Sequence, residues 1–167
     1  MATIFTVQID GPGRLAISPR PRGGDWLNDD VAALAQNGVG MLVSLLCADE
    51  ARDLGLQDEA AVCAQHHIEF IPLPVLDMCA PEDASHFIEA VHRLARLVRE
   101  GSNVAVHCRQ SIGRSGLLAV SIAIACGNSL ETALDVVSTA RGVRVPETEE
   151  QRDWLRRNAD RLSVKAT

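Results

Sequence analysis

The reactive chemistry of this chain centres on Cys108 and Arg114, which lie close together in the stretch HCRQSIGRSG, residues 107–116. A cysteine thiolate is a nucleophile, and an arginine guanidinium can hold two oxygens of a tetrahedral oxyanion at once. The consecutive backbone N–H groups of a tight loop between them can form an anion-binding nest. The pair therefore predicts phosphoryl transfer from a monoester to the sulfur, followed by hydrolysis of the phosphocysteine.

The residues on either side of this stretch predict a strand, a loop and a helix. Residues 103–106 are apolar and partly β-branched, as expected of a short buried strand. Residues 117–126 are apolar on every side and end at Gly127, which predicts a helix buried in a core. The amides of the first helical turn, together with the helix dipole, would favour the thiolate form of Cys108.

Each of the two residues has an ordinary interpretation when taken alone. A cysteine at the end of a buried strand is usually a small hydrophobic residue, and an arginine at a helix start is usually solvated. The spacing of Cys108 and Arg114 in a strand–loop–helix setting favours the phosphate-binding loop instead.

The same stretch resembles the signature loop of the cysteine-dependent protein tyrosine phosphatases, Cys-x5-Arg-Ser/Thr, with a His before the cysteine and a Gly before the arginine. The resemblance implies that Cys108 is the nucleophile and that the loop holds the phosphate. The implied substrate-binding residues are Arg109, Gln110, Ser111, Ile112, Gly113 and Arg114.

Ser111 departs from the family pattern, because the family usually has glycine at this position. If the loop needs a positive φ there, serine is strained by roughly 1 kcal/mol.

An acid is needed to protonate the leaving oxygen, and Asp77 is the candidate. In the family this acid is an aspartate on a loop upstream of the cysteine. Here Val75-Leu76-Asp77 replaces the Trp-Pro-Asp of larger members and is closer to the small dual-specificity enzymes. The alternative is a turn aspartate that caps backbone amides, with Asp83 as the reserve acid.

Ser115 and Gln151 complete the catalytic set that the resemblance implies. Ser115 would hydrogen-bond the departing thiolate, although it could be an ordinary first-turn serine. Residues 140–151 resemble the late loop whose Gln positions the hydrolytic water, and Gln151 is the match. Thr148 and Gln151 equally fit a helix capping box. His107, pointing away from the pocket, is expected to support the loop through hydrogen bonds.

The remaining cysteines and histidines predict neither a metal site nor another cofactor. The five cysteines have no zinc-like spacing, and His66 and His67 point in different directions on a helix. In the superfamily a second cysteine can trap the nucleophile as a reversible disulfide. Cys47, at the end of a predicted strand, is a candidate for this role, the alternative being an inert buried thiol.

Strands and helices alternate along the chain, which predicts one α/β domain over residues 1–167 with a mostly parallel sheet of about five strands and helices on both faces. The expected strands are residues 3–9, 14–17, 41–46, 68–73 and 103–106. Six helices are expected. The first is capped by Asp25 or Asn28 and ends at residue 36, the second covers residues 56 or 57 to 66, and the third starts at residues 81–83 and ends at Gly101. The fourth covers residues 117–126, the fifth follows a cap at Ser129, and the sixth covers residues 149 to about 162 after a cap at Thr148.

Charge and composition indicate which classes of binding partner and which cellular location to expect. A net charge of −6 and the absence of tyrosine argue against a nucleic-acid partner. Residues 1–10 do not resemble a signal peptide, and the longest apolar stretch is too short to span a bilayer. The odd cysteine count argues against a secreted disulfide scaffold. We therefore expect a cytoplasmic protein without stable membrane association, acting on a phosphorylated protein or a small phosphomonoester.

Three other functions compete with a protein tyrosine or dual-specificity phosphatase. Phosphoinositide phosphatases carry basic residues inside this loop, whereas Ser111, Ile112 and Gly113 are neutral and only Arg109 is basic. A rhodanese-like sulfurtransferase would not explain Arg114 followed by a serine. A non-catalytic phosphate-binding module would need no nucleophile.

Overall fold

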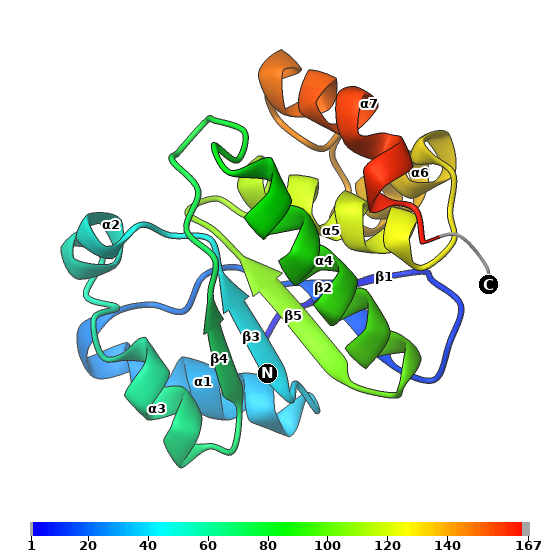
Figure 1. The fold of residues 1–167 in the computed structure, drawn as a ribbon. Helices are drawn as coiled ribbons and strands as arrows, with labels where there is room; N and C mark the ends of the chain where they lie inside the picture. The colour runs from blue at the N-terminus through cyan, green and yellow to red at the C-terminus, as the bar shows by residue number, and fades with distance from the viewer. Residues whose placement is uncertain (1, 165–167) are drawn as a thin grey trace.

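The structure is a computed structural model that describes residues 2–164. Its sheet has the strand order β1-β2-β5-β3-β4, and only β1 is antiparallel to its neighbour (Figure 1). The strands are β1 Phe5–Val7, β2 Arg14–Ile17, β3 Met41–Ser44, β4 Glu69–Pro72 and β5 Asn103–His107. The predicted fold class, with five mostly parallel strands, is confirmed.

The helices cover both faces of this sheet, as predicted. Figure 1 shows α1 and α3 on one face and α4 to α7 on the other. Their bounds are α1 Leu27–Gln36, α2 Ala48–Asp53, α3 Glu59–Gln65, α4 Ala84–Arg99, α5 Arg114–Ala125, α6 Leu130–Arg141 and α7 Glu149–Leu162, and a 3-10 turn at Gly24–Trp26 precedes α1.

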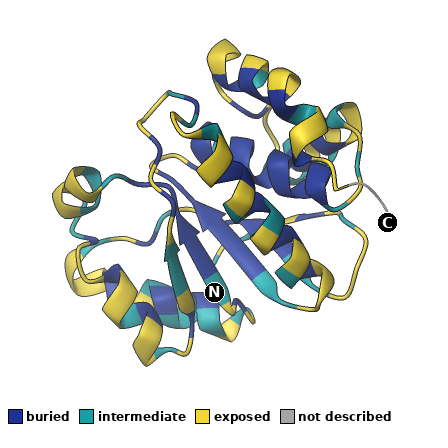
Figure 2. Ribbon diagram, viewed as in Figure 1, coloured by how far each residue is buried: buried dark blue, intermediate teal, exposed yellow. Residues whose placement is uncertain are grey.

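Each face of the sheet contributes to its own hydrophobic core. The larger core packs α4, α5 and α7 against the sheet and contains Leu118, Val106 and Trp154. The smaller core lies under α1 and α3 and contains Val31 and Cys63. Every residue of α5 is buried, which explains why its sequence is apolar on all sides (Figure 2).

Several predicted helix ends are wrong. Neither Asp25 nor Asn28 caps α1, because the 3-10 turn places Trp26 at its N-cap without a side-chain hydrogen bond. Helix α4 begins at Ala84, after the predicted start, and Asp83 is its N-cap. The predicted caps Ser129 and Thr148 are both confirmed.

Helix α2 is not among the predicted helices. It is short and polar, and its N-cap position holds Cys47 rather than a Ser, Thr, Asp or Asn, so the usual start signal is missing. It lies beyond the end of β3, at the edge where the parallel strands β3, β4 and β5 all end (Figure 1). Open parallel sheets bind their ligands at this edge.

Candidate active site

The predicted strand–loop–helix unit is present, with β5 ending at His107 and α5 beginning at Arg114. Cys108 is only 3% exposed, and its Sγ lies 3.2 Å from the Oγ of Ser115 in the first turn of α5. A hydroxyl at this distance can donate a hydrogen bond to a thiolate, so the structure brings Cys108 and its predicted partner together.

The loop between them presents free backbone donors. Within residues 2–164, no amide N–H of residues 109–114 donates a hydrogen bond to another protein group. Ser111 has φ 57°, so it does occupy the left-handed region where the family usually has glycine. Its buried hydroxyl donates to the carbonyl of Ser18 at 2.6 Å, which fixes the residue in this conformation.

Arg114 is buried and makes several hydrogen bonds. Its Nη1 and Nη2 donate to the two carboxylate oxygens of Glu50 at 2.7 and 2.9 Å, and Nη1 also donates to the carbonyl of Val75 at 2.9 Å. Burial alone would lower the pKa of Arg114, but the hydrogen bonds to Glu50 and the nearby acidic groups raise it. The guanidinium is therefore charged and held in one orientation.

Glu50 is a site residue that the sequence analysis missed. It belongs to α2, and its Oε2 also accepts the N–H of Cys47 at 3.0 Å. Burial works against its charge, but the hydrogen bonds from Arg114 and from the Cys47 backbone outweigh it and lower the pKa of Glu50. No local signal could have found it, because its partner lies far along the chain in another element.

Asp77 lies beside the same arginine. One of its carboxylate oxygens is 3.0 Å from Nη2 of Arg114 and also accepts the N–H of Met78. Its side chain is half-exposed, so it can move relative to the buried loop. The reserve candidate Asp83 instead accepts the N–H of His86 at 3.0 Å as the cap of α4.

The predicted nucleophile Cys108, Arg114 and the candidate acid Asp77 share one cavity. It is lined by Asp77, Met78, Cys108, Gln110, Gly113, Arg114 and Glu147. Of the other loop residues, Arg109 is exposed with Nη1 3.9 Å from Glu50, while the side chain of Ile112 packs against the core. Any contact of these two residues with a phosphate would therefore use their backbone amides.

Gln151 is buried behind Gly113. Its amide accepts the N–H of Thr148 and donates to the carbonyl of Cys79, so the predicted capping box is present. A Cβ on Gly113 would lie 3.1 Å from this amide, so a side chain at that position would require Gln151 to shift. The role of Gln151 toward a hydrolytic water stays a prediction.

His107 supports the loop from the rear. Its Nε2 pairs with the buried carboxylate of Glu59 at 2.7 Å, and Glu59 belongs to α3 rather than to the elements that line the cavity. Glu59 is thus a second supporting residue that the sequence analysis did not identify.

Three of the other thiols, those of Cys47, Cys63 and Cys126, have raised pKa values. Burial, followed by the charge of Glu50, raises the pKa of Cys47, and its Sγ contacts the carbonyl of Val75 at 3.6 Å. Burial raises the pKa of Cys63 to about 12 and also raises that of Cys126. The proposed disulfide between Cys47 and Cys108 stays a prediction.

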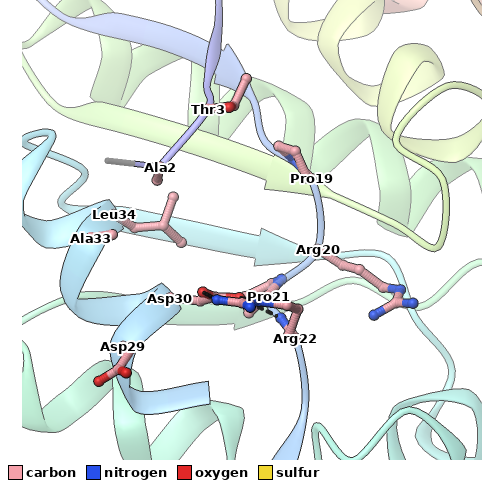
Figure 3. A pocket seen from close by; sticks show the side chains of 10 residues that line it. All are labelled: Ala2, Thr3, Pro19, Arg20, Pro21, Arg22, Asp29, Asp30, Ala33 and Leu34. Atoms are coloured by element: carbon pink, nitrogen blue, oxygen red, sulfur yellow. Dashed lines mark hydrogen bonds and ion pairs between the residues drawn. The ribbon is translucent and has the colours of Figure 1, made fainter. Parts of the chain in front are cut away.

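A larger hollow of about 380 Å³ lies away from this chemistry, between α1, the loop before it and the N-terminal residues (Figure 3). Two of its four charged residues, Arg22 and Asp30, form an ion pair at 2.7 Å, and no cysteine or histidine lines it. Size alone therefore does not identify the site.

The described part of the chain contains neither a cluster of metal ligands nor a helix that could span a membrane. In residues 2–164, no group of three or more His, Cys, Asp or Glu side chains could hold a metal ion. No helix in the same range combines the length and the apolarity needed to cross a bilayer.

Solved structures that share this fold include phosphatases. Kinase associated phosphatase, with its catalytic-site cysteine replaced by serine, matches with a TM-score of 0.87 at 19% identity over 96% of each chain. Tk-PTP in its active form matches with a TM-score of 0.76 at 27% identity, covering 94% of this chain and 97% of that one. PTPMT1 in complex with PI(5)P has a TM-score of 0.75 at 17% identity, covering 95% and 96%.

No curated protein sequence matches the chain. A family model does, and it covers residues 18–128, which include β3 to α5 and therefore both Glu50 and the whole signature loop. This is more than half of the chain, so the protein belongs to the family described as "Polymorphic toxin system, DSP-PTPase phosphatase" and is a cysteine-dependent phosphatase.

Proposed function

We propose that this enzyme hydrolyses phosphorylated proteins, on tyrosine and on serine or threonine, through a phosphocysteine on Cys108. The observation that carries the proposal is the convergence of the Cys108 sulfur, the Arg114 guanidinium and the Asp77 carboxylate on one cavity. A sulfurtransferase would have no use for the acid, and a passive phosphate binder would have no use for the thiol.

The first chemical step is attack by the Cys108 thiolate on phosphorus. A sulfur–phosphorus bond forms while the bond to the ester oxygen breaks, and Asp77 gives its proton to that oxygen. Arg114 and the free amides of residues 109–113 stabilise the charge on the three non-bridging oxygens. Because Asp77 contacts Arg114 in this structure, a bound phosphate would take its place on the guanidinium and turn the carboxyl toward the leaving group.

The second step is hydrolysis of the phosphocysteine. Water attacks phosphorus, Asp77 takes a proton from that water, and the sulfur leaves as a thiolate. The Ser115 hydroxyl, 3.2 Å from the sulfur, stabilises this thiolate by donating a hydrogen bond. Gln151 would orient the water, which requires one of its two present hydrogen bonds to open.

The rim of the cavity supports a protein substrate over a phosphoinositide. The segment between β4 and α4 that carries Asp77, residues 73–83, is called the acid loop here. Its residues Leu76 and Met78 are exposed large hydrophobic residues and offer a suitable surface for a peptide next to the phosphate. Between the nucleophile and Arg114, the loop residues that line the cavity are Gln110 and Gly113, neither of which is basic. All five cysteines are free, which fits a cytoplasmic location.

A substrate panel tests this proposal. We expect the wild-type enzyme to hydrolyse phosphotyrosine and phosphothreonine peptides faster than phosphatidylinositol phosphates, and Cys108→Ser to hydrolyse none of them. If kcat/KM is higher for the lipids, the substrate class is phosphoinositides instead of phosphorylated proteins. Sulfur transfer from thiosulfate without phosphatase activity would reject the mechanism.

A further inference from the structure

Arg141 contacts the signature loop from outside the cavity. It is the last residue of α6, and its Nε donates to the carbonyl of Ser111 at 2.8 Å while Nη2 reaches the carbonyl of Gln110 at 3.4 Å. One guanidinium thus holds two consecutive carbonyl groups, and both contacts are made to the backbone.

The geometry of the peptide bond turns these contacts into an effect inside the loop. In a trans peptide the C=O and the N–H point in opposite directions. The Gln110 carbonyl shares a peptide unit with the N–H of Ser111, and the Ser111 carbonyl shares one with the N–H of Ile112. With both carbonyls directed toward Arg141, these two N–H groups point to the side of the loop opposite that guanidinium.

The conformation of Ser111 explains why such a hold is needed. Its φ of 57° lets two successive N–H groups converge, but costs a non-glycine residue about 1 kcal/mol. Two contacts oppose a flip to an ordinary conformation. One is the hydroxyl bond to Ser18, and the other is the bond from Arg141 to the carbonyl.

The side chain of Arg141 is oriented by a contact with a strand outside the site. Its guanidinium carbon lies 4.5 Å from the ring centroid of Phe5 on β1, and the side chain is half-buried. Stacking of a guanidinium on an aromatic face restricts its orientation. The antiparallel edge strand therefore takes part in holding the loop.

We propose that Arg141 is a positioning residue that orients the amides of Ser111 and Ile112 for the substrate oxyanion. The proposal rests on the proposed function, because it requires the loop to bind a phosphoryl group. It assigns a role in oxyanion binding to a residue that does not itself touch the substrate.

The test is calorimetric titration of the full-length protein with tungstate, a tetrahedral oxyanion, together with kcat and KM. Because a charge-assisted hydrogen bond that orients two donors is lost, Arg141→Met should weaken tungstate binding about tenfold and lower kcat/KM by a similar factor. Arg141→Lys should recover part of the affinity, since one amine can reach only one carbonyl well.

Arg144→Met is the matched control. Arg144 is exposed and lies three residues further along the chain, so its replacement removes the same charge from a nearby position. In the described structure its side chain makes no hydrogen bond to residues 108–113. The tungstate affinity of Arg144→Met should stay within about twofold of wild type, as expected when no hydrogen bond is lost. Equal losses in the two variants would mean that charge, rather than the carbonyl contacts, is responsible, and would overturn the proposal.

If Arg141→Met binds tungstate with wild-type affinity, the proposal is also overturned, and Arg141 is then only a basic residue at the C-terminus of α6. If Arg141→Met fails to fold, Phe5→Leu and Arg141→Lys take its place, and wild-type affinity in both overturns the proposal in the same way. Absence of tungstate binding by the wild-type protein itself would instead reject the proposed function, and this proposal with it.

Discussion

The two loops that face each other across the cavity differ in how they are held. In the signature loop, Arg109 and Gln110 are exposed, but Cys108 is 3% exposed and Ser111 is 1% exposed. In the acid loop, Leu76 is 53% exposed, Met78 is 49% exposed and the Asp77 side chain is 50% exposed. A segment with few buried contacts has a low local stability, whereas a loop whose key residues are buried opens only together with the core.

The acid loop is nonetheless attached at both ends. Val75 donates its N–H to the carbonyl of Leu45, and the carbonyls of Met78 and Cys79 accept hydrogen bonds from Thr148 and Gln151. The difference indicates a division of labour. In the proposed mechanism the oxyanion site is preorganised by burial, while Asp77 lies on an exposed segment that would turn between Arg114 and a leaving group.

Removal of the acid should have the largest effect on activity. Asp77→Asn keeps the shape of the side chain but cannot donate the proton, so kcat should fall about a hundredfold or more while KM changes little. Stopped-flow or steady-state assays with a phosphotyrosine peptide measure this. An unchanged kcat would show that Asp77 only caps the turn at Met78.

Weakening the hold on Arg114 in the signature loop should have an intermediate effect on activity. Glu50→Gln keeps a hydrogen-bond acceptor but removes the charge that fixes Arg114, so kcat/KM should fall about tenfold. An equal loss for tungstate binding would place the defect in the oxyanion site. Full wild-type activity would contradict the role of Glu50.

The same variant has a pH signature. The folded-state pKa of Glu50 lies below its usual 4.5. Its stabilising contribution is therefore complete above that value and is lost as the pH falls through the folded-state pKa. Thermal unfolding of Glu50→Gln should approach that of wild type in acid, and a stability difference that grows toward low pH would reverse this assignment.

The smallest effect on activity is expected at Asp83. Asp83→Ala removes the N-cap of α4 and should lower the free energy of unfolding by about 1 kcal/mol, measured by urea denaturation. Because its carboxylate caps a helix instead of lining the cavity, kcat should stay near wild type. A hundredfold loss of kcat would instead make Asp83 the acid and remove the contrast between the two loops.

Local patterns predicted the parts of the site that are local in sequence. The strand before Cys108 and the buried helix after Arg114 both follow from residues within one short stretch. The positive φ at Ser111 was expected only on the condition, suggested by the resemblance, that the loop needs one there. The parallel sheet also follows, since alternating strands and helices have few other ways to pack.

Contacts between distant segments could not be predicted in this way. Glu50 and Arg141 contact the loop from α2 and α6, and either residue looks like an ordinary surface charge in the sequence. The short helix α2 also lacks a standard cap, so no pattern marked the segment that carries Glu50. Such partners are selected by the fold, and only the three-dimensional structure reveals them.

The most direct test of the mechanism is to trap the covalent intermediate. The enzyme is mixed with a phosphotyrosine peptide, quenched in acid within one turnover and digested, and the peptide containing Cys108 is analysed by mass spectrometry, with Cys108→Ser as the control. We predict a phosphoryl group on Cys108 in the wild-type enzyme and none in the variant. Substrate turnover without that adduct, or with the phosphoryl group on another residue such as His107, would contradict catalysis through a phosphocysteine.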